Sequence, residues 1–562
     1  MFLAFHQVLN PAGNLLLTTL LALVPVVLLL LLLAVFRITA WLAVIIGSAV
    51  TLLLGLLFWQ APLDGSLRAY VLGSATGLWA VNWITFWGVM IFNTLVLTGL
   101  FESFKRWLLV QATADIRVQT LLLAWAFGAL LEGLVGFGYP WAVVAPILIA
   151  FGIAELDAIR VAAIANNAPV SYGALGAPII GLAAVTQLNL FELSASIGKI
   201  VAVLALLPPW VLIFLVSGWR GIRTGWPLAI VGSLSYIAGQ FPTSQFLGPY
   251  LPDIVGSLVC FAVLLVFIKV WQPKETLGFG GVPVSPEAQR RAEALTPAVP
   301  AGEHAPLAEV ANRPQTRRDL WLGLAPFIIL VIVVVLWTGP WSPLPKYMPF
   351  KASAGFLSSI SGKAGSVAFS WAPGVAGTAI FVAWLLILVL LAVTVKPNFR
   401  QLLPGVLARS WKQMWGAFLV AFFIFGLANV FNYSGMGNSM AYGFSKIGPA
   451  YILIVAVVGW IGVALSGSNT STNALFGAFQ KTVGQLLGFP ALLLPSLNSV
   501  GAEVGKPVAP QTCSVGVATT SYVRNEGAAI RHNMGWTLVL LAYLILIGVL
   551  FYVFFPGTMQ PH

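Results

Sequence analysis

The residues that could carry chemistry are few, because only 8% of the 562 residues are charged and 59% are apolar. Glu132, in the apolar string GALLEGLVGFGYP, has no basic residue in its motif. An ionisable side chain in such a stretch is costly to bury and is therefore a functional candidate. Burial should favour its protonated form, as a reversible proton carrier requires. The structural alternative is a carboxylate that caps backbone amides at a turn.

Glu503 and Lys506 lie three residues apart in the string NSVGAEVGKPVAPQT. In a helical segment this spacing puts both side chains on one face, where they can pair. Such a buried pair can be purely structural. The functional interpretation is that Lys506 attracts the carboxylate of a substrate while Glu503 modulates it or accepts a proton. Asp253, at the start of another apolar stretch, is expected to cap a helix.

Two polar but uncharged strings add candidates for binding a small anion. Hydroxyls, amides and free backbone N–H groups at a helix N-terminus attract carboxylates, although plain N-capping explains some of these residues. The string LSGSNTSTNALF supplies Ser466, Ser468, Asn469, Thr470, Ser471, Thr472 and Asn473. The string NNAPVSYGALGAP supplies Asn166, Asn167, Ser171 and Tyr172.

The composition places these candidates in a polytopic membrane protein. A soluble domain carries about 25% charged residues, so an ordinary soluble enzyme is excluded, and the abundance of apolar residues excludes disorder. The net charge of +12 comes from basic residues between apolar spans, which is typical of cytoplasmic loops and does not indicate a nucleic-acid partner. The four histidines lie near the termini or in polar loops, and the two cysteines lie in apolar strings. We therefore expect no metal and no cofactor.

Apolar runs of about 20 residues predict an all-α membrane fold with 12 full crossings. Residues 119–153 and 448–482 are apolar but interrupted by glycine, proline and polar residues. The basic residues in the flanking loops indicate that each segment enters and leaves the membrane on the same side, as a re-entrant hairpin. The two hairpins enter from opposite faces of the membrane. Residues 488–522 are expected to form a broken helix. The proline-rich, basic segment 272–320 is expected to be a flexible cytoplasmic linker between a first membrane half, 1–271, and a second, 321–562. Both termini should then face outside.

The two halves carry an internal repeat. Three sparse patterns recur in the same order at offsets of 336, 334 and 332 residues, and they begin at Asn93 and Asn429, Gly128 and Gly462, and Asn166 and Asn498. The predicted topology makes the Asn93 and Asn429 helices run in opposite directions, so the repeats are inverted. Inverted repeats with broken helices and opposed hairpins are typical of secondary transporters.

The motifs resemble the lactate permease family of bacterial membrane carriers over nearly the whole chain. The matching strings are NPAGN at 10–14, GALLEGLVGFG at 128–138, NNAPVSYGALGAP at 166–178, GWRG at 218–221, LPDI at 251–254, NYSG at 432–435, SGSNTSTNALF at 466–476 and GKPVAPQ at 505–511. The resemblance implies proton-coupled symport of L-lactate, D-lactate and glycolate across the bacterial plasma membrane. The family pattern usually has aspartate where this chain has Asn469, and lacks an acid at Glu503. These departures favour Glu132 as the coupling acid.

Other functions compete with a proton–lactate symporter. A Na⁺-coupled carrier of larger carboxylates would need clustered oxygen ligands, and only Glu132 and Glu503 are available as carboxylates in the motifs. A channel is less compatible with opposed hairpins than alternating access is. An intramembrane enzyme is disfavoured because the apolar strings contain no histidine, no paired aspartates and no metal-ligand cluster.

Overall fold

The computed structural model describes residues 5–284, except 112 and 137, and residues 317–561, except 519. The predicted linker therefore lies largely outside the described residues. The first half contains the helices α1 Leu15–Ala34, α2 Ala40–Leu57, α3 Leu63–Thr76, α4 Trp83–Leu97, α5 Leu100–Gln111, α6 Ile116–Gln119, α7 Gly128–Leu134, α8 Tyr139–Ala150, α9 Glu155–Ala165, α10 Gly173–Thr186, α11 Leu190–Leu204, α12 Pro208–Phe246 and α13 Pro252–Val270. The π-helical segments Gly77–Asn82 and Thr120–Phe127 join α3 to α4 and α6 to α7.

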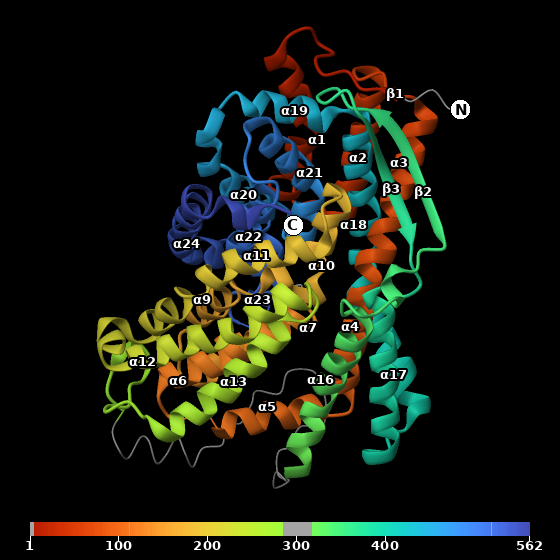
Figure 1. Cartoon of the computed structure of the whole chain (residues 1–562). Helices are drawn as coiled ribbons and strands as arrows, with labels where there is room; N and C mark the ends of the chain where they lie inside the picture. Colours follow the sequence, from red (N-terminus) through yellow and green to blue (C-terminus); the bar gives the residue numbers. More distant parts are fainter. Residues whose placement is uncertain (1–4, 112, 137, 285–316, 519, 562) are drawn as a thin grey trace.

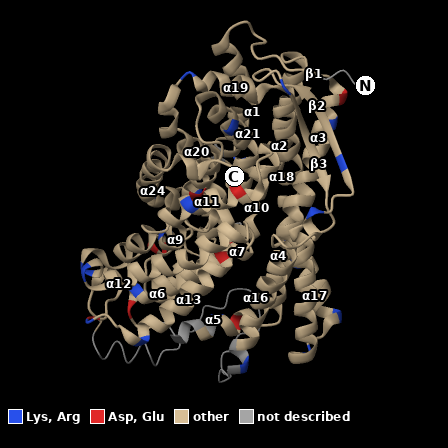
Figure 2. Ribbon diagram, in the orientation of Figure 1, with Lys and Arg blue, Asp and Glu red and all other residues tan. Residues whose placement is uncertain are grey.

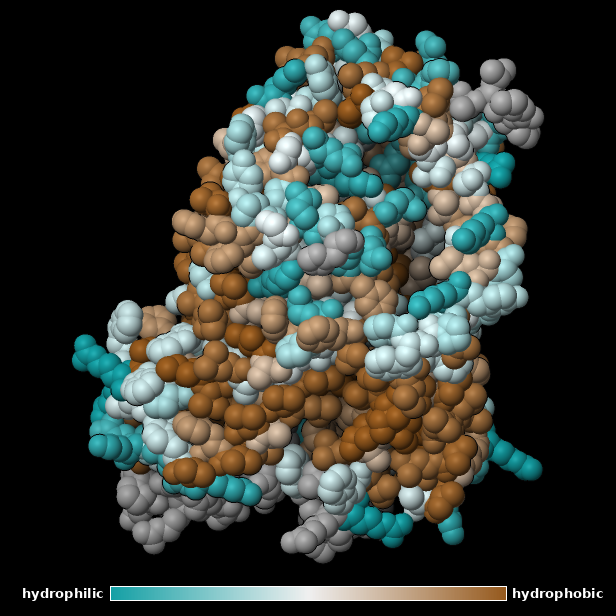
Figure 3. Space-filling model, in the orientation of Figure 1, coloured by the Kyte–Doolittle hydropathy of each residue, from teal (hydrophilic) through white to brown (hydrophobic). Residues whose placement is uncertain are grey.

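The second half contains the helices α16 Arg317–Thr338, α17 Ala376–Thr394, α18 Phe399–Ser434, α19 Met436–Ser445, α20 Val455–Ser466, α21 Asn469–Leu487, α22 Leu493–Gly505, α23 Pro510–Val517 and α24 Glu526–Phe554. Within the described residues, ten helices are long and apolar enough to cross a membrane, or up to twelve if each of two bent helix pairs is one span. The face seen in Figure 3 carries a broad apolar area over its lower half, as a lipid-facing surface requires. Figure 2 shows few charged residues in the middle of the molecule.

The two halves pack through the long helices of the repeat. Gly73 lies against the backbone of Phe425, and further along Asn93 donates through Nδ2 to Ser410 Oγ at 2.9 Å, so the segment α3–α4 runs antiparallel to α18. Between these contacts, Asn82 Nδ2 donates to Phe418 O at 3.4 Å, and the two residues are 336 positions apart. A residue that contacts its own repeat counterpart lies on a two-fold axis. This packing agrees with the predicted inverted repeat.

Each half also contains a helical hairpin that ends in a glycine turn. Gly136 and Gly138, with φ of 68° and 74°, separate α7 from α8, and Gly467, with φ of 74°, separates α20 from α21. A Cβ on Gly138 would lie 2.7 Å from Thr512 Cγ2, and one on Gly467 would lie 2.5 Å from Gln511 Oε1. Both hairpin tips therefore pack against the first turn of α23.

The helix that follows each hairpin is broken at equivalent positions. In the first half Ala174, Leu175 and Gly176 all have positive φ, which is rare for residues with a side chain. Just before this kink, the helical segments Glu155–Ala165 and Val170–Thr186 meet at an angle of 67°. In the second half the 3-10 turn Lys506–Val508 separates α22 from α23. Residue 506 follows residue 174 by the repeat offset of 332. Residues 488–522 thus contain α22, the 3-10 turn and α23, and the kink at residues 174–176 is the counterpart of that turn in the first half.

A small sheet differs from the expected all-α architecture. Residues 350–371 form a sheet in which β2 Phe350–Leu357 pairs antiparallel with β3 Ala364–Trp371 and parallel with β1 Phe5–His6. Figure 1 places this sheet at the opposite end of the molecule from the start of α16.

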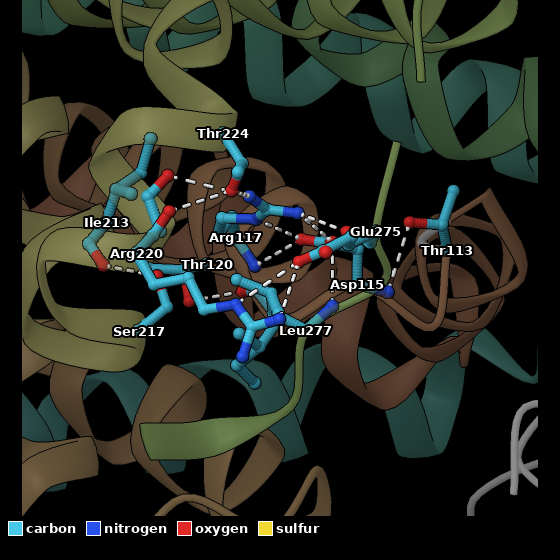
Figure 4. Close-up of polar contacts among 12 residues, drawn as sticks. Thr113, Asp115, Arg117, Thr120, Ile213, Ser217, Arg220, Thr224, Glu275 and Leu277 are labelled. Carbon is cyan, nitrogen blue, oxygen red and sulfur yellow. Dashed lines mark hydrogen bonds and ion pairs between the residues drawn. The ribbon is translucent and has the colours of Figure 1, made fainter. Parts of the chain in front are cut away.

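The start of the predicted linker is held by a buried arginine (Figure 4). Arg117 is fully buried and donates to both carboxylate oxygens of Asp115 at 2.9 and 2.5 Å, to Thr224 Oγ1 at 2.6 Å and to Glu275 O at 2.7 Å. The N–H of Leu277 also donates to Asp115 Oδ2, at 3.1 Å. These contacts fix residues 275–277 to α6 and α12, so the linker is anchored at its beginning.

Arg117→Met is expected to lower the free energy of unfolding by about 3–5 kcal/mol, because it leaves the buried Asp115 carboxylate without its ion partner. Arg220→Met is the matched control. The Arg220–Glu275 bridge, at 2.9 Å, is about half exposed, so its loss should cost about 1 kcal/mol or less. Thermal unfolding of the two purified variants in detergent checks this difference. Equal losses in both variants would contradict the anchoring role of Arg117.

Candidate functional site

The buried ionisable groups meet where the first hairpin, the α9–α10 break and the α22–α23 break come together. α7 supplies Glu132, and the segment between α9 and α10 supplies Asn166 and Ser171. The end of α22 supplies Glu503, and the 3-10 turn after it supplies Lys506. These five side chains are each at most 5% exposed. Sequence-predicted candidates from both halves are therefore brought together in one buried cluster.

An ion pair across the two halves is the centre of this cluster. Lys506 Nζ donates to Glu132 Oε1 at 2.5 Å, and Asn166 Nδ2 donates to Glu132 Oε2 at 3.1 Å. Glu132 and Lys506 are 374 positions apart in the chain. The glycine at position 173 leaves the space for this carboxylate, because a Cβ there would lie 2.6 Å from Glu132 Oε1. The expected local pairing of Lys506 with Glu503 is thus wrong, since Lys506 pairs with Glu132.

Glu503 is held instead by the first half. The backbone N–H of Ser171 donates to Glu503 Oε2 at 3.1 Å, and the Ser171 hydroxyl donates to the same oxygen. Ser171 and Glu503 are 332 positions apart, which is the repeat offset at this point of the chain. This contact, like that of Asn82 with Phe418, therefore lies on the pseudo-two-fold axis between the repeats. Glu503 Oε1 has no hydrogen-bond partner among the described residues.

Several hydroxyl and amide candidates are occupied by structural hydrogen bonds. Ser468 caps α21 by accepting from the N–H of Ser471 at 3.2 Å, and Ser466 Oγ lies 3.1 Å from Thr472 Oγ1. These contacts close the tip of the second hairpin. The capping interpretation of the serine-rich string thus accounts for part of it.

Two further candidates hold neighbouring helices together. Tyr172 donates to Ser194 O at 2.6 Å. Asn473 Nδ2 donates to Ser499 Oγ at 2.9 Å, which ties α21 to α22.

Other candidates remain without partners although they are buried. Within the described part of the chain, the amides of Asn167 and Asn469 have no hydrogen-bond partner on either Oδ1 or Nδ2. The Oδ1 atom of Asn166 also has none there. Asn167 is fully buried and Asn469 is 4% exposed. An unpaired buried polar atom is costly, so these groups are the ones available to a polar ligand. Thr470 is partly exposed and its methyl group faces Gly181.

Asp253 is a third buried acid, and sequence analysis misassigned it to helix capping. It is 1% exposed and accepts a hydrogen bond from the Tyr236 hydroxyl at 2.9 Å. A Cβ on Gly133, the residue next to Glu132, would lie 2.7 Å from Asp253 Cβ. Asp253, Glu132, Glu503 and Lys506 lie within electrostatic range of one another. The signal in the sequence was an acid within an apolar stretch, the same signal that identified Glu132.

A cavity of about 310 Å³ lies at the far end of α10 from this cluster. Its lining includes Ala183 of α10, Gln187 directly after that helix, Ala80 of the π-helical segment Gly77–Asn82 and Phe369 of β3. The ion pair of Glu132 and Lys506 is outside this lining. Because Glu132 and Lys506 are at most 5% exposed, the structure shows a conformation in which this ion pair is shielded from solvent.

Comparisons with known proteins agree over almost the full length of the chain. The family model described as L-lactate permease matches residues 18–555. Glycolate permease GlcA of Escherichia coli K12 is 31% identical over 98% of this chain and 99% of its own length. L-lactate permease of Bacillus subtilis 168 is 31% identical over 96% of each chain. Among solved structures, the Alcanivorax borkumensis YdaH transporter aligns with 93% of this chain and 100% of its own, at a TM-score of 0.49 and 15% identity.

Proposed function

Because this chain belongs to the L-lactate permease family, we propose that it carries L-lactate and related short 2-hydroxy monocarboxylates across the bacterial plasma membrane together with a proton. D-lactate and glycolate are included in this substrate class. Membership of the family makes the chain a multi-pass membrane transporter and not an enzyme. The coupling to protons and the role of each residue in the cluster are the substance of the proposal.

The observation that carries the proposal is the buried ion pair between Glu132 and Lys506. The cationic Lys506 is the natural partner for a substrate carboxylate, but in this conformation Glu132 occupies it. Adding a substrate anion while Glu132 stays ionised would leave one buried negative charge in excess, which is costly in a low-dielectric interior. Protonating Glu132 at the same time keeps the cluster neutral and frees the lysine. Anion and proton would therefore enter and leave together.

The polar groups around the pair would support this exchange. Asn166 donates to Glu132 Oε2 and can hold the carboxyl group in place in either protonation state, because the amide can donate and accept. The broken helices and the two hairpin tips place the pair at the interface between the repeats. A site at that interface is accessible to alternate sides when one repeat moves against the other.

Uptake of labelled lactate into proteoliposomes tests the function. A pH gradient with the alkaline side inside should drive accumulation, a protonophore should abolish it, and a Na⁺ gradient at equal pH should have no effect. Protein-free liposomes correct for diffusion of the undissociated acid. Accumulation that follows the Na⁺ gradient and ignores the pH gradient would instead establish a Na⁺-coupled carrier.

A further inference from the structure

The cavity at the end of α10 lies along one face of that helix. Four of its lining residues have the spacing of a single helical face: Ile180, Ala183, Ala184 and Gln187. Ile180 is 7% exposed, whereas Gln187 at the other end of the row is exposed to solvent. The opposite face of α10 packs on α21, since a Cβ on Gly477 would lie 2.5 Å from Leu182 Cδ1 and 3.0 Å from Val185 Cγ2. One side of α10 is therefore packed and the other borders an open space.

The cavity lies between the sheet and the part of α10 that leads to the ion pair. Its other walls include Thr76 of α3 and residues 368–370 of β3, an edge strand of the sheet. Figure 3 shows the surface hollowed beside the sheet, at the opposite end of the molecule from the start of α16. The inner lining residue, Ile180, follows Gly173 by seven residues, and Gly173 leaves the space for the Glu132 carboxylate.

The equivalent face of the second repeat is covered. At the repeat offset of 332, Ala184 is equivalent to Gly516 of α23. A Cβ on Gly516 would lie 3.1 Å from Trp141 Cε3 of α8. Ile180 is likewise equivalent to Thr512, which is 2% exposed and packs against the tip of the first hairpin. The two repeats thus differ at equivalent positions, with one face open and the other closed.

We propose that this cavity is the outer opening of the substrate path, and that the covered face of α23 is its inner opening, closed in this conformation. The proposal rests on the proposed function, because both openings lead to the ion pair. Inverted repeats exchange their conformations when a carrier changes the side to which it opens. In the opposite conformation the first hairpin therefore leaves α23, and the space beside α10 closes.

Thiol labelling in right-side-out and inside-out vesicles tests both openings, because the native Cys260 and Cys513 are fully buried. Ala184→Cys should react with membrane-impermeant sulfonatoethyl methanethiosulfonate added from outside. Val185→Cys, the matched control on the packed face, should react at least about tenfold more slowly, because a thiol must be accessible to react. Thr512→Cys should react only from inside. Lactate at acidic external pH should speed this reaction and slow that of Ala184→Cys, because it shifts the population towards the opposite conformation.

The charge of the adduct tests whether the substrate anion passes through the cavity. Neither a sulfonatoethyl nor a trimethylammonioethyl adduct on Ala184→Cys fills a space of about 310 Å³. A negative charge beside the path repels an entering anion, so the sulfonate adduct should lower the initial rate of lactate uptake at least about fivefold more than the trimethylammonium adduct.

Three results would overturn the proposal. Equal inhibition by the two adducts would show a distortion of α10, and uptake unchanged by both would show a surface crevice. Reaction of Ala184→Cys only from inside would place the cavity on the other side of the membrane. Labelling rates do not depend on transport, and pH-driven uptake by the unmodified chain is measured in the same vesicles. Failure of the path and failure of the proposed function therefore remain distinguishable.

Discussion

Glu132→Gln is expected to abolish the pH-driven accumulation of lactate while leaving lactate–lactate exchange intact. One pH unit corresponds to about 1.4 kcal/mol, so an electroneutral cycle with one proton supports about a tenfold accumulation ratio. In the variant this ratio should fall to about one, because the amide cannot release or accept the proton. Exchange survives because the glutamine imitates the protonated carboxyl, which leaves Lys506 free for the substrate.

The membrane potential adds to this argument. An anion that enters without a proton is opposed by an inside-negative potential at about 2.3 kcal/mol per 100 mV. A variant that cannot carry the proton should therefore fail to concentrate lactate even at high external concentration. Counterflow in proteoliposomes measures exchange, and uptake under an imposed pH gradient measures accumulation in the same preparation.

Asp64→Asn is the control for the loss of an acid. Asp64 is exposed in the first turn of α3, so its replacement should leave both accumulation and exchange at normal rates. If Glu132→Gln still concentrates lactate at the normal rate, the proton is carried elsewhere. Glu503 and Asp253 are then the next acids to replace.

The parts of the site that sequence analysis identified are those with a local signal. Glu132 and Glu503 are acids in apolar strings, and their cost of burial marks them without any knowledge of the fold. The glycine turns of the hairpins and the break near residue 506 also follow from local glycine and proline, whereas the break near residue 174 was not predicted. The broad fold, with its spans and two halves, could be predicted for the same reason.

The pairing within the site could not be predicted from spacing. Local rules describe neighbours three or four residues apart, whereas Lys506 reaches a glutamate 374 positions away. The repeat contained a stronger signal that was not used. Ser171 and Glu503 occupy equivalent positions, 332 apart, and a polar pair at equivalent positions is what a two-fold axis can bring into contact.

The small sheet was missed for a different physical reason. The strands β2 and β3 consist largely of small residues, in FKASAGFL and AGSVAFSW, so the alternation of apolar and polar side chains is weak. Packing stabilises them instead. Ala354 and Val367 are buried in a cluster with Tyr433 of α18, with Phe5 packed against it. Such long-range packing between the N-terminus, a loop and a span has no local pattern in the sequence.

Lys506→Met is expected to reduce both accumulation and exchange strongly, which distinguishes it from Glu132→Gln. Methionine keeps a similar shape but removes the charge that anchors the substrate carboxylate. A hydrogen bond to a charged group contributes about 1.5–3 kcal/mol, so substrate binding should weaken by about 10- to 100-fold. The single variant should also be less stable, because Glu132 is left buried without its ion partner.

The double variant Glu132→Gln with Lys506→Met separates the loss of substrate binding from the loss of stability that Lys506→Met is expected to cause. Removing both charges eliminates the unpaired carboxylate, so thermal stability in detergent should return towards that of the unmodified protein. Exchange should stay as low as in Lys506→Met, because no cation remains to bind lactate at the centre of the cluster. Non-additivity of this kind is expected for two residues in direct contact. If the stable double variant exchanges lactate as fast as Glu132→Gln alone, Lys506 is only a structural counter-ion for Glu132, and the substrate carboxylate is bound by other groups.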